Sequence, residues 1–109
     1  MKNYYDLFVQ LSLQQCSKND YGDKEKMKAH NKASKKLRQL QEEMKTNDCA
    51  GVLNNLLDYN DDRVRINAAY LCLKMNIHKD KVLQTLKDVV DNTTDPTLAF
   101  SAKMALQGM

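Results

Sequence analysis

The stretch that decides the fold is Asp61–Met75, with the sequence DDRVRINAAYLCLKM. One set of its side chains recurs at helical spacing and is mainly apolar: Val64, Ala68, Leu71, Cys72 and Met75. A second set at the same spacing is polar: Arg63, Asn67, Tyr70 and Lys74. Asp61 or Asp62 can cap the start, because a carboxylate oxygen accepts hydrogen bonds from free backbone N–H groups. The stretch is therefore predicted to be a helix with one face toward a core and the other toward something outside it.

Helix-favouring composition extends along all 109 residues. The chain has one Pro and three Gly, and 42% of its residues are apolar, which is enough for one domain with a modest core. A polar turn is expected around residues 17–23, and Asp48 is expected to cap the third helix. We predict a single all-α domain over residues 1–109. Its six helices are expected near residues 3–17, 24–46, 48–58, 61–76, 78–90 and 95–108.

The segment 24–46 combines an apolar stripe with an excess of positive charge. Residues 18–46 contain nine Lys and Arg against five Asp and Glu, a balance of +4. One interpretation is a solvated face whose lysine stems cover apolar surface. The other is a face for an anionic partner, in which phosphates would be contacted by Lys28, Lys32, Lys35 and Arg38. Both interpretations remain open at this point.

The residues do not form a recognisable catalytic or metal-binding pattern. Asp58-x-Asn60-x-Asp62 is similar to the start of a calcium loop, but Arg63 stands where that loop requires Gly and Ala69 where it requires Glu. His30 and His78 have no partner at metal-ligand spacing, and no Gly-rich stretch could cradle a phosphate. An enzyme is therefore the least supported class, and we expect no cofactor, no metal and no membrane span. The three widely spaced cysteines suit reduced thiols and a cytoplasmic protein.

The central helix resembles the inner helix of a HEAT-type repeat. The resemblance rests on Asp61-Asp62-x-Val64-Arg65-x-x-Ala68-Ala69 and on a weaker copy 34 residues later, Asp95-Pro96-x-Leu98-x-x-x-Ala102. The preceding segments also correspond, since Val52-Leu53-x-x-Leu56 is echoed by Val82-Leu83-x-x-Leu86. The resemblance implies a short α-solenoid, in which a helical pair (1–46) caps two HEAT-like hairpins (47–109). It also implies that Arg65 is structural and pairs with the turn aspartate and with carbonyl groups of a neighbouring repeat.

Nearly the whole chain resembles a small bacterial all-helical family with HEAT-like repeats, some members of which are immunity proteins of contact-dependent or polymorphic toxin systems. The segments that carry this likeness include Tyr5-Asp6-Leu7-Phe8-Val9, Val64-Arg65-x-Asn67-Ala68-Ala69 and Lys81-Val82-Leu83. The resemblance implies a binding protein, as a monomer or a heterodimer with its toxin. It would neutralise a toxin domain, expected to be a nuclease, by blocking the active site or substrate access.

The residues expected to contact such a partner form two groups. The first is the polar stripe with its counterparts in the second repeat: Arg63, Asn67, Tyr70, Lys74, Ser101 and Lys103. The second is the turn before the central helix, whose carboxylates could imitate phosphates: Asp58, Tyr59, Asn60, Asp61 and Asp62. The alternative function is a nucleic-acid-binding or scaffold protein that uses the basic helix 24–46.

Overall fold

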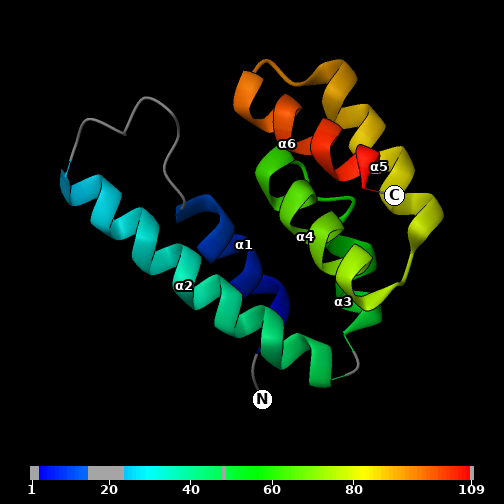
Figure 1. Ribbon diagram of the computed structural model, residues 1–109. Helices are drawn as coiled ribbons and strands as arrows, with labels where there is room; N and C mark the ends of the chain where they lie inside the picture. The colour runs from blue at the N-terminus through cyan, green and yellow to red at the C-terminus, as the bar shows by residue number, and fades with distance from the viewer. Residues whose placement is uncertain (1–2, 15–23, 48, 109) are drawn as a thin grey trace. The chain divides into compact units, whose positions relative to one another are not determined.

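The computed structural model describes residues 3–14, 24–47 and 49–108, with side chains described from residue 31 onward in the second range (Figure 1). The predicted turn at 17–23, the Asp48 cap, Cys16 and the Lys28 side chain lie outside the described residues. Within the described residues there are six helices and no strand, which confirms the predicted all-α class. None of these helices is long and apolar enough to cross a membrane.

The chain divides into two compact units, Met1–Cys49 and Ala50–Met109. The first unit contains α1 (Tyr4–Gln14) and α2 (Lys24–Thr46), which pack against each other. Asn3 caps α1, because its side-chain oxygen accepts the Asp6 backbone N–H at 3.0 Å. The predicted stripe of α2 is buried, with exposed fractions of 4% or less for Ala33, Leu37, Leu40 and Met44.

The second unit contains α3 (Ala50–Leu56), α4 (Asp62–Met75), α5 (Lys79–Asn92) and α6 (Pro96–Gln107). Helix α4 is the centre of this unit, because it contacts α3, α5 and α6 (Figure 1). Its predicted apolar stripe is buried from Val64 to Cys72. Helices α5 and α6 pack as a pair and contribute the fully buried side chains of Val82, Leu86, Val89 and Ala102. The core of the unit is therefore built around the stretch on which the prediction rested.

Helix α3 is shorter than predicted, since it ends at Leu56 and not near Asp58. The chain closes there into tight turns, in which the Asp58 N–H donates to the Asn55 carbonyl and the Tyr59 N–H to the Leu56 carbonyl, both at 3.1 Å. Leu57 is still buried, with 2% of its surface exposed. The periodicity continued through Leu57 because that side chain belongs to the core although its backbone has left the helix.

Two aspartates fix the starts of α4 and α6. The Asp61 carboxylate accepts the N–H groups of Arg63 and Val64 at 2.9 and 3.2 Å. Asp95 accepts those of Thr97 and Leu98 in the same way, with Pro96 following at the first helical position. Helix α4 ends at Asn76, whose φ of 60° is the left-handed conformation that Asn tolerates better than most residues. The starts of α4 and α6 are thus set by side-chain caps that the sequence displays, whereas α5 begins after His78 without a side-chain cap and extends to Asn92, beyond the predicted end near residue 90.

Replacing Asp61 by Ala should lower the free energy of unfolding by about 1 kcal/mol, because two backbone N–H groups at the start of α4 lose their acceptor. Asp61→Asn should lower it by less, since its amide oxygen can still accept those hydrogen bonds. Urea unfolding followed by circular dichroism compares the three proteins. Equal losses for the Ala and Asn variants would contradict the assigned cap.

Candidate partner-binding surface

Tyr70 links α4 to α6. Its hydroxyl donates a hydrogen bond to the Ser101 carbonyl oxygen at 2.9 Å, while 36% of the side chain remains exposed. The structure thus brings together two residues of the predicted polar stripe that are 31 positions apart in the chain. A tyrosine ring held at both ends is a preorganised contact, because little further side-chain freedom is lost when a partner covers it.

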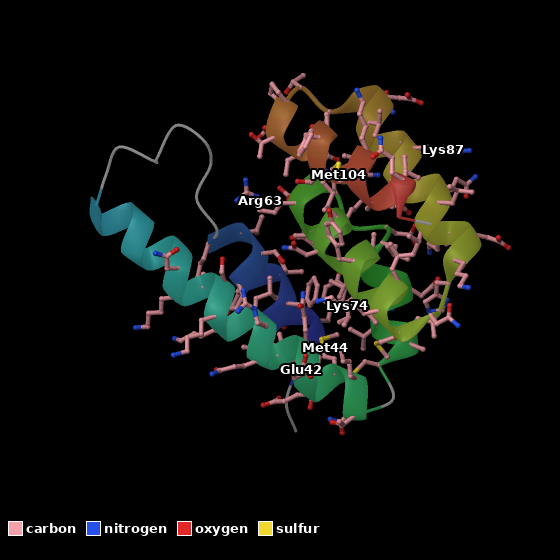
Figure 2. The ribbon with its side chains drawn as sticks, in the orientation of Figure 1. Glu42, Met44, Arg63, Lys74, Lys87 and Met104 are labelled. Carbon is pink, nitrogen blue, oxygen red and sulfur yellow. The ribbon has the colours of Figure 1, made fainter. Side chains whose placement is uncertain are left out.

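The other residues of the predicted stripe differ in availability. Lys74 and Lys103 are exposed, whereas Arg63, Asn67 and Ser101 are half-buried. Arg63 and Asn67 also take part in interactions of their own. Figure 2 shows Arg63 and Lys74 projecting from α4 and Met104 from α6. The freely presented part of the stripe therefore consists of Tyr70, Lys74 and Lys103.

The turn between α3 and α4 has little carboxylate left for a partner. Asp61 caps α4, Asp58 forms an ion pair with the Lys81 ammonium at 2.6 Å, and Asp62 pairs with Arg65. Lys81 also donates to the backbone and side-chain oxygens of Asn54, both at 3.0 Å. Of the five predicted turn residues, Asn60 is exposed and Tyr59 is half-buried with a partner of its own. Asp58, Asp61 and Asp62 therefore all have structural roles within the fold.

Arg65 joins the two hairpins of the second unit. Its guanidinium donates to Asp62 of its own helix and to Asp88 of α5 at 2.8 Å. Burial works against its charge, but the hydrogen bonds and charges of Asp62 and Asp88 outweigh that effect and hold the pKa of Arg65 above its ordinary value. Within the described residues its Nε is buried without an acceptor. The geometry agrees with the structural role expected for Arg65.

A shallow cleft of about 280 Å³ lies beside Arg65. It is lined by the Arg65–Asp88 and Lys81–Asp58 ion pairs and by Leu57, Gln84 and Thr85. Its charged groups already hold one another, as Arg65 does with Asp88 and Lys81 with Asp58. The described residues contain no group of three potential metal ligands. The Nε2 atom of His78 lies 2.8 Å from the Ala50 carbonyl oxygen, so it links α5 to α3. These groups therefore stabilise the hairpins.

Two exposed apolar residues of α6 extend the candidate surface and were missed by the sequence prediction. Phe100 is 64% exposed and Met104 is 49% exposed. They are four residues apart and so share one side of the helix. The 34-residue correspondence indicates Met104, because it aligns Met104 with Tyr70, but it aligns Phe100 with the buried Ile66 and so does not predict that Phe100 is exposed. We use "α4–α6 surface" below for Tyr70, Lys74, Phe100, Lys103 and Met104.

The basic helix presents its predicted residues to solvent where they are described. Lys32, Lys35 and Arg38 are all exposed on α2. An exposed row of cations is the minimum that contact with phosphates requires. The same exposure is also expected of a solvated helix, so this geometry is compatible with both interpretations.

Burial makes the Cys72 thiol a pH-dependent element of the core. Desolvation raises its pKa from 9.0 to about 11, against a smaller opposite effect of the Lys81 charge. The folded state therefore holds this proton more tightly than the unfolded state, and stability should be complete below pH 9 and fall as pH rises toward 11. Urea unfolding across that window should show a shallower pH dependence for Cys72→Ala than for the wild type. Identical slopes would contradict a protonated thiol in the core.

Comparison with curated proteins found no match, and comparison with solved structures found none. The chain does match a protein family over residues 2–109, which is almost its full length. On this match the chain belongs to the family described as Domain of unknown function (DUF2019).

Proposed function

We propose that this chain is an immunity protein, which binds a bacterial toxin domain in the cytoplasm and neutralises it through the α4–α6 surface. Two considerations support the proposal. The first is the resemblance of nearly the whole sequence to a HEAT-like family with immunity proteins among its members, carried by segments that include Tyr5-Asp6-Leu7-Phe8-Val9, Val64-Arg65-x-Asn67-Ala68-Ala69 and Lys81-Val82-Leu83. The second is the character of the α4–α6 surface, which suits a protein partner.

The observation that carries the proposal is the exposure of three large side chains on adjoining helices. Tyr70, Phe100 and Met104 are 36%, 64% and 49% exposed, although the chain has only two Phe and no Trp. Aromatic residues and Met are enriched in protein interfaces, where they act as anchors that fill pockets of the partner. Two exposed lysines, Lys74 and Lys103, accompany them and can form the polar rim.

The surface is built for binding without rearrangement. Tyr70 is fixed by Ser101, α4 and α6 each begin at an aspartate cap, and Arg65 ties α4 to α5. A typical protein interface covers about 800 Å² per partner, roughly the area that a few exposed turns of two helices can supply. Bound over or beside a toxin active site, such a module would exclude the substrate and would need no chemistry of its own.

A tagged copy of the chain, used in its native cells to capture a toxin domain after nuclease treatment, supplies the partner, and co-expression of the two proteins tests the proposal. The toxin domain alone should arrest growth, and co-production of this chain should restore it. The two proteins should also co-purify in equal amounts after nuclease treatment and a high-salt wash. Growth arrest that persists despite full production of the chain would overturn the proposal.

A second candidate is nucleic-acid binding by α2, which the exposure of Lys32, Lys35 and Arg38 favours. Charge reversal at Lys32 and Lys35 separates the two functions. The double variant should lose salt-sensitive binding to nucleic acid if α2 contacts phosphates. Toxin neutralisation should be unchanged in the same variant, because neither residue belongs to the α4–α6 surface.

A further inference from the structure

The α4–α6 surface has a one-sided charge distribution. Helix α6 contains no Asp or Glu, and α4 contains only Asp62, which is paired with Arg65. The exposed charged residues on these two helices beyond the first turn of α4 are Lys74 and Lys103. Phe100 and Met104 therefore lie on a helix whose charge is entirely positive.

Most aspartates of the second unit are already engaged within the fold and are not available to bind a partner. The unit contains seven Asp and no Glu, and five of the seven pair with a cation or cap a helix: Asp58, Asp61, Asp62, Asp88 and Asp95. The remaining two, Asp80 and Asp91, are on α5. Imitation of phosphates by the turn would break caps and ion pairs, so an acidic mode of recognition is disfavoured.

The exposure of Phe100 differs from that of the corresponding residue of α4. Tyr70 reaches α6, and Ile66 lies one turn before Tyr70 on the same side of α4 with 3% of its surface exposed. The residue 34 positions after Ile66 is Phe100, which is 64% exposed. Phe100 is therefore exposed although the corresponding residue of α4 is buried.

We propose that the occupant of the α4–α6 surface is an acidic protein surface with an apolar cavity for Phe100 and Met104, carried by the toxin domain. This inference rests on the proposed function and specifies its partner. Carboxylates of the partner would lie against Lys74 and Lys103, since complementary potentials speed association and select the partner. A nuclease would then be bound beside its basic substrate cleft, because that cleft would repel the same lysines.

The probe is the toxin domain captured with the tagged chain, with its catalytic residue inactivated, titrated by calorimetry at low and at physiological salt. The test variant is Lys74→Glu with Lys103→Glu. The matched control is Lys79→Glu with Lys87→Glu, which changes the net charge equally at two exposed positions of α5. The test variant should weaken binding by about 10-fold or more at low salt, and the control by no more than about 3-fold. Phe100→Ala should weaken it at both salt concentrations.

Each other outcome counts against the inference. If the toxin binds the wild type and the Lys74/Lys103 variant equally, the acidic contact is overturned while the immunity function stands. The same holds if the Lys74/Lys103 variant and the Lys79/Lys87 variant weaken toxin binding by the same factor. If the wild type does not bind the toxin domain, the inference and the proposed function fail together. A dimer of this chain in sedimentation that disappears in Phe100→Ala would make a second copy the occupant, which also overturns the inference.

Discussion

Replacing Arg65 by Met should lower the free energy of unfolding by about 2 kcal/mol, the largest stability change expected of a polar substitution here. Arg65 is 19% exposed and holds two carboxylates, Asp62 and Asp88, that are 28% and 51% exposed. Loss of the guanidinium removes the cation from both carboxylates, although Asp88 still accepts a hydrogen bond from the Asn92 side chain at 2.8 Å. Their partial exposure lets water replace some of the interaction, which keeps the effect below that of a fully buried pair.

Arg65→Lys should lose about 1 kcal/mol, because a compact ammonium keeps the charge but cannot reach both carboxylates as the planar guanidinium does. Lys87→Met, at an exposed position of α5, serves as the control and should change stability by less than about 0.5 kcal/mol. A double-mutant cycle with Asp88→Asn isolates the contact between the two hairpins. Equal stability of Arg65→Met and the wild type in urea would contradict the account of this network.

Replacing Tyr70 by Ala should weaken toxin binding by about 30-fold, the effect of losing an aromatic anchor worth about 2 kcal/mol. The substitution removes the exposed ring and the hydrogen bond to the Ser101 carbonyl. Tyr70→Phe should retain most of the affinity, because the ring remains and only its fixation is lost. Calorimetric titration of the inactivated toxin domain measures each variant, after circular dichroism has shown that it is folded.

Leu83→Ala is the matched control, because Leu83 on α5 has the same exposed fraction as Tyr70, 36%. Truncation there removes a similar degree of exposed apolar contact from a helix outside the α4–α6 surface. Its affinity for the toxin should match that of the wild type. Similar losses in Leu83→Ala and Tyr70→Ala would show that general loss of stability, and not the surface, governs binding.

The local features of this chain were predictable from sequence because they depend on residues a few positions apart. Asp61 and Asp95 cap helices within three residues, and the stripe from Val64 to Cys72 is read from a single helix. Asn3 was missed as a cap, although an Asn three residues before an acidic residue is a recognisable signal. The all-α class follows from such signals repeated along the chain.

The long-range contacts were harder to predict. Arg65 pairs with Asp88, which lies 23 residues away in the chain. The repeat resemblance implied a partner in a neighbouring unit but did not identify Asp88. The repeat resemblance paired Arg65 with one turn aspartate, but the ion pair of Asp58 with Lys81, 23 residues away, could not be read from the sequence. The exposure of Phe100 was not predicted, because exposure depends on which helices surround a residue. Which candidate residues are exposed to a partner therefore depends on how the helices pack against one another, and not on which segments form helices.

The most direct test of the central claim is an NMR titration of the labelled chain with the inactivated toxin domain. We predict that the largest amide and side-chain shift changes will fall on Tyr70, Lys74, Ser101 and Met104, at or beside the α4–α6 surface. Shift changes confined to Lys32, Lys35 and Arg38 on α2, or no shift changes at saturating toxin, would contradict it.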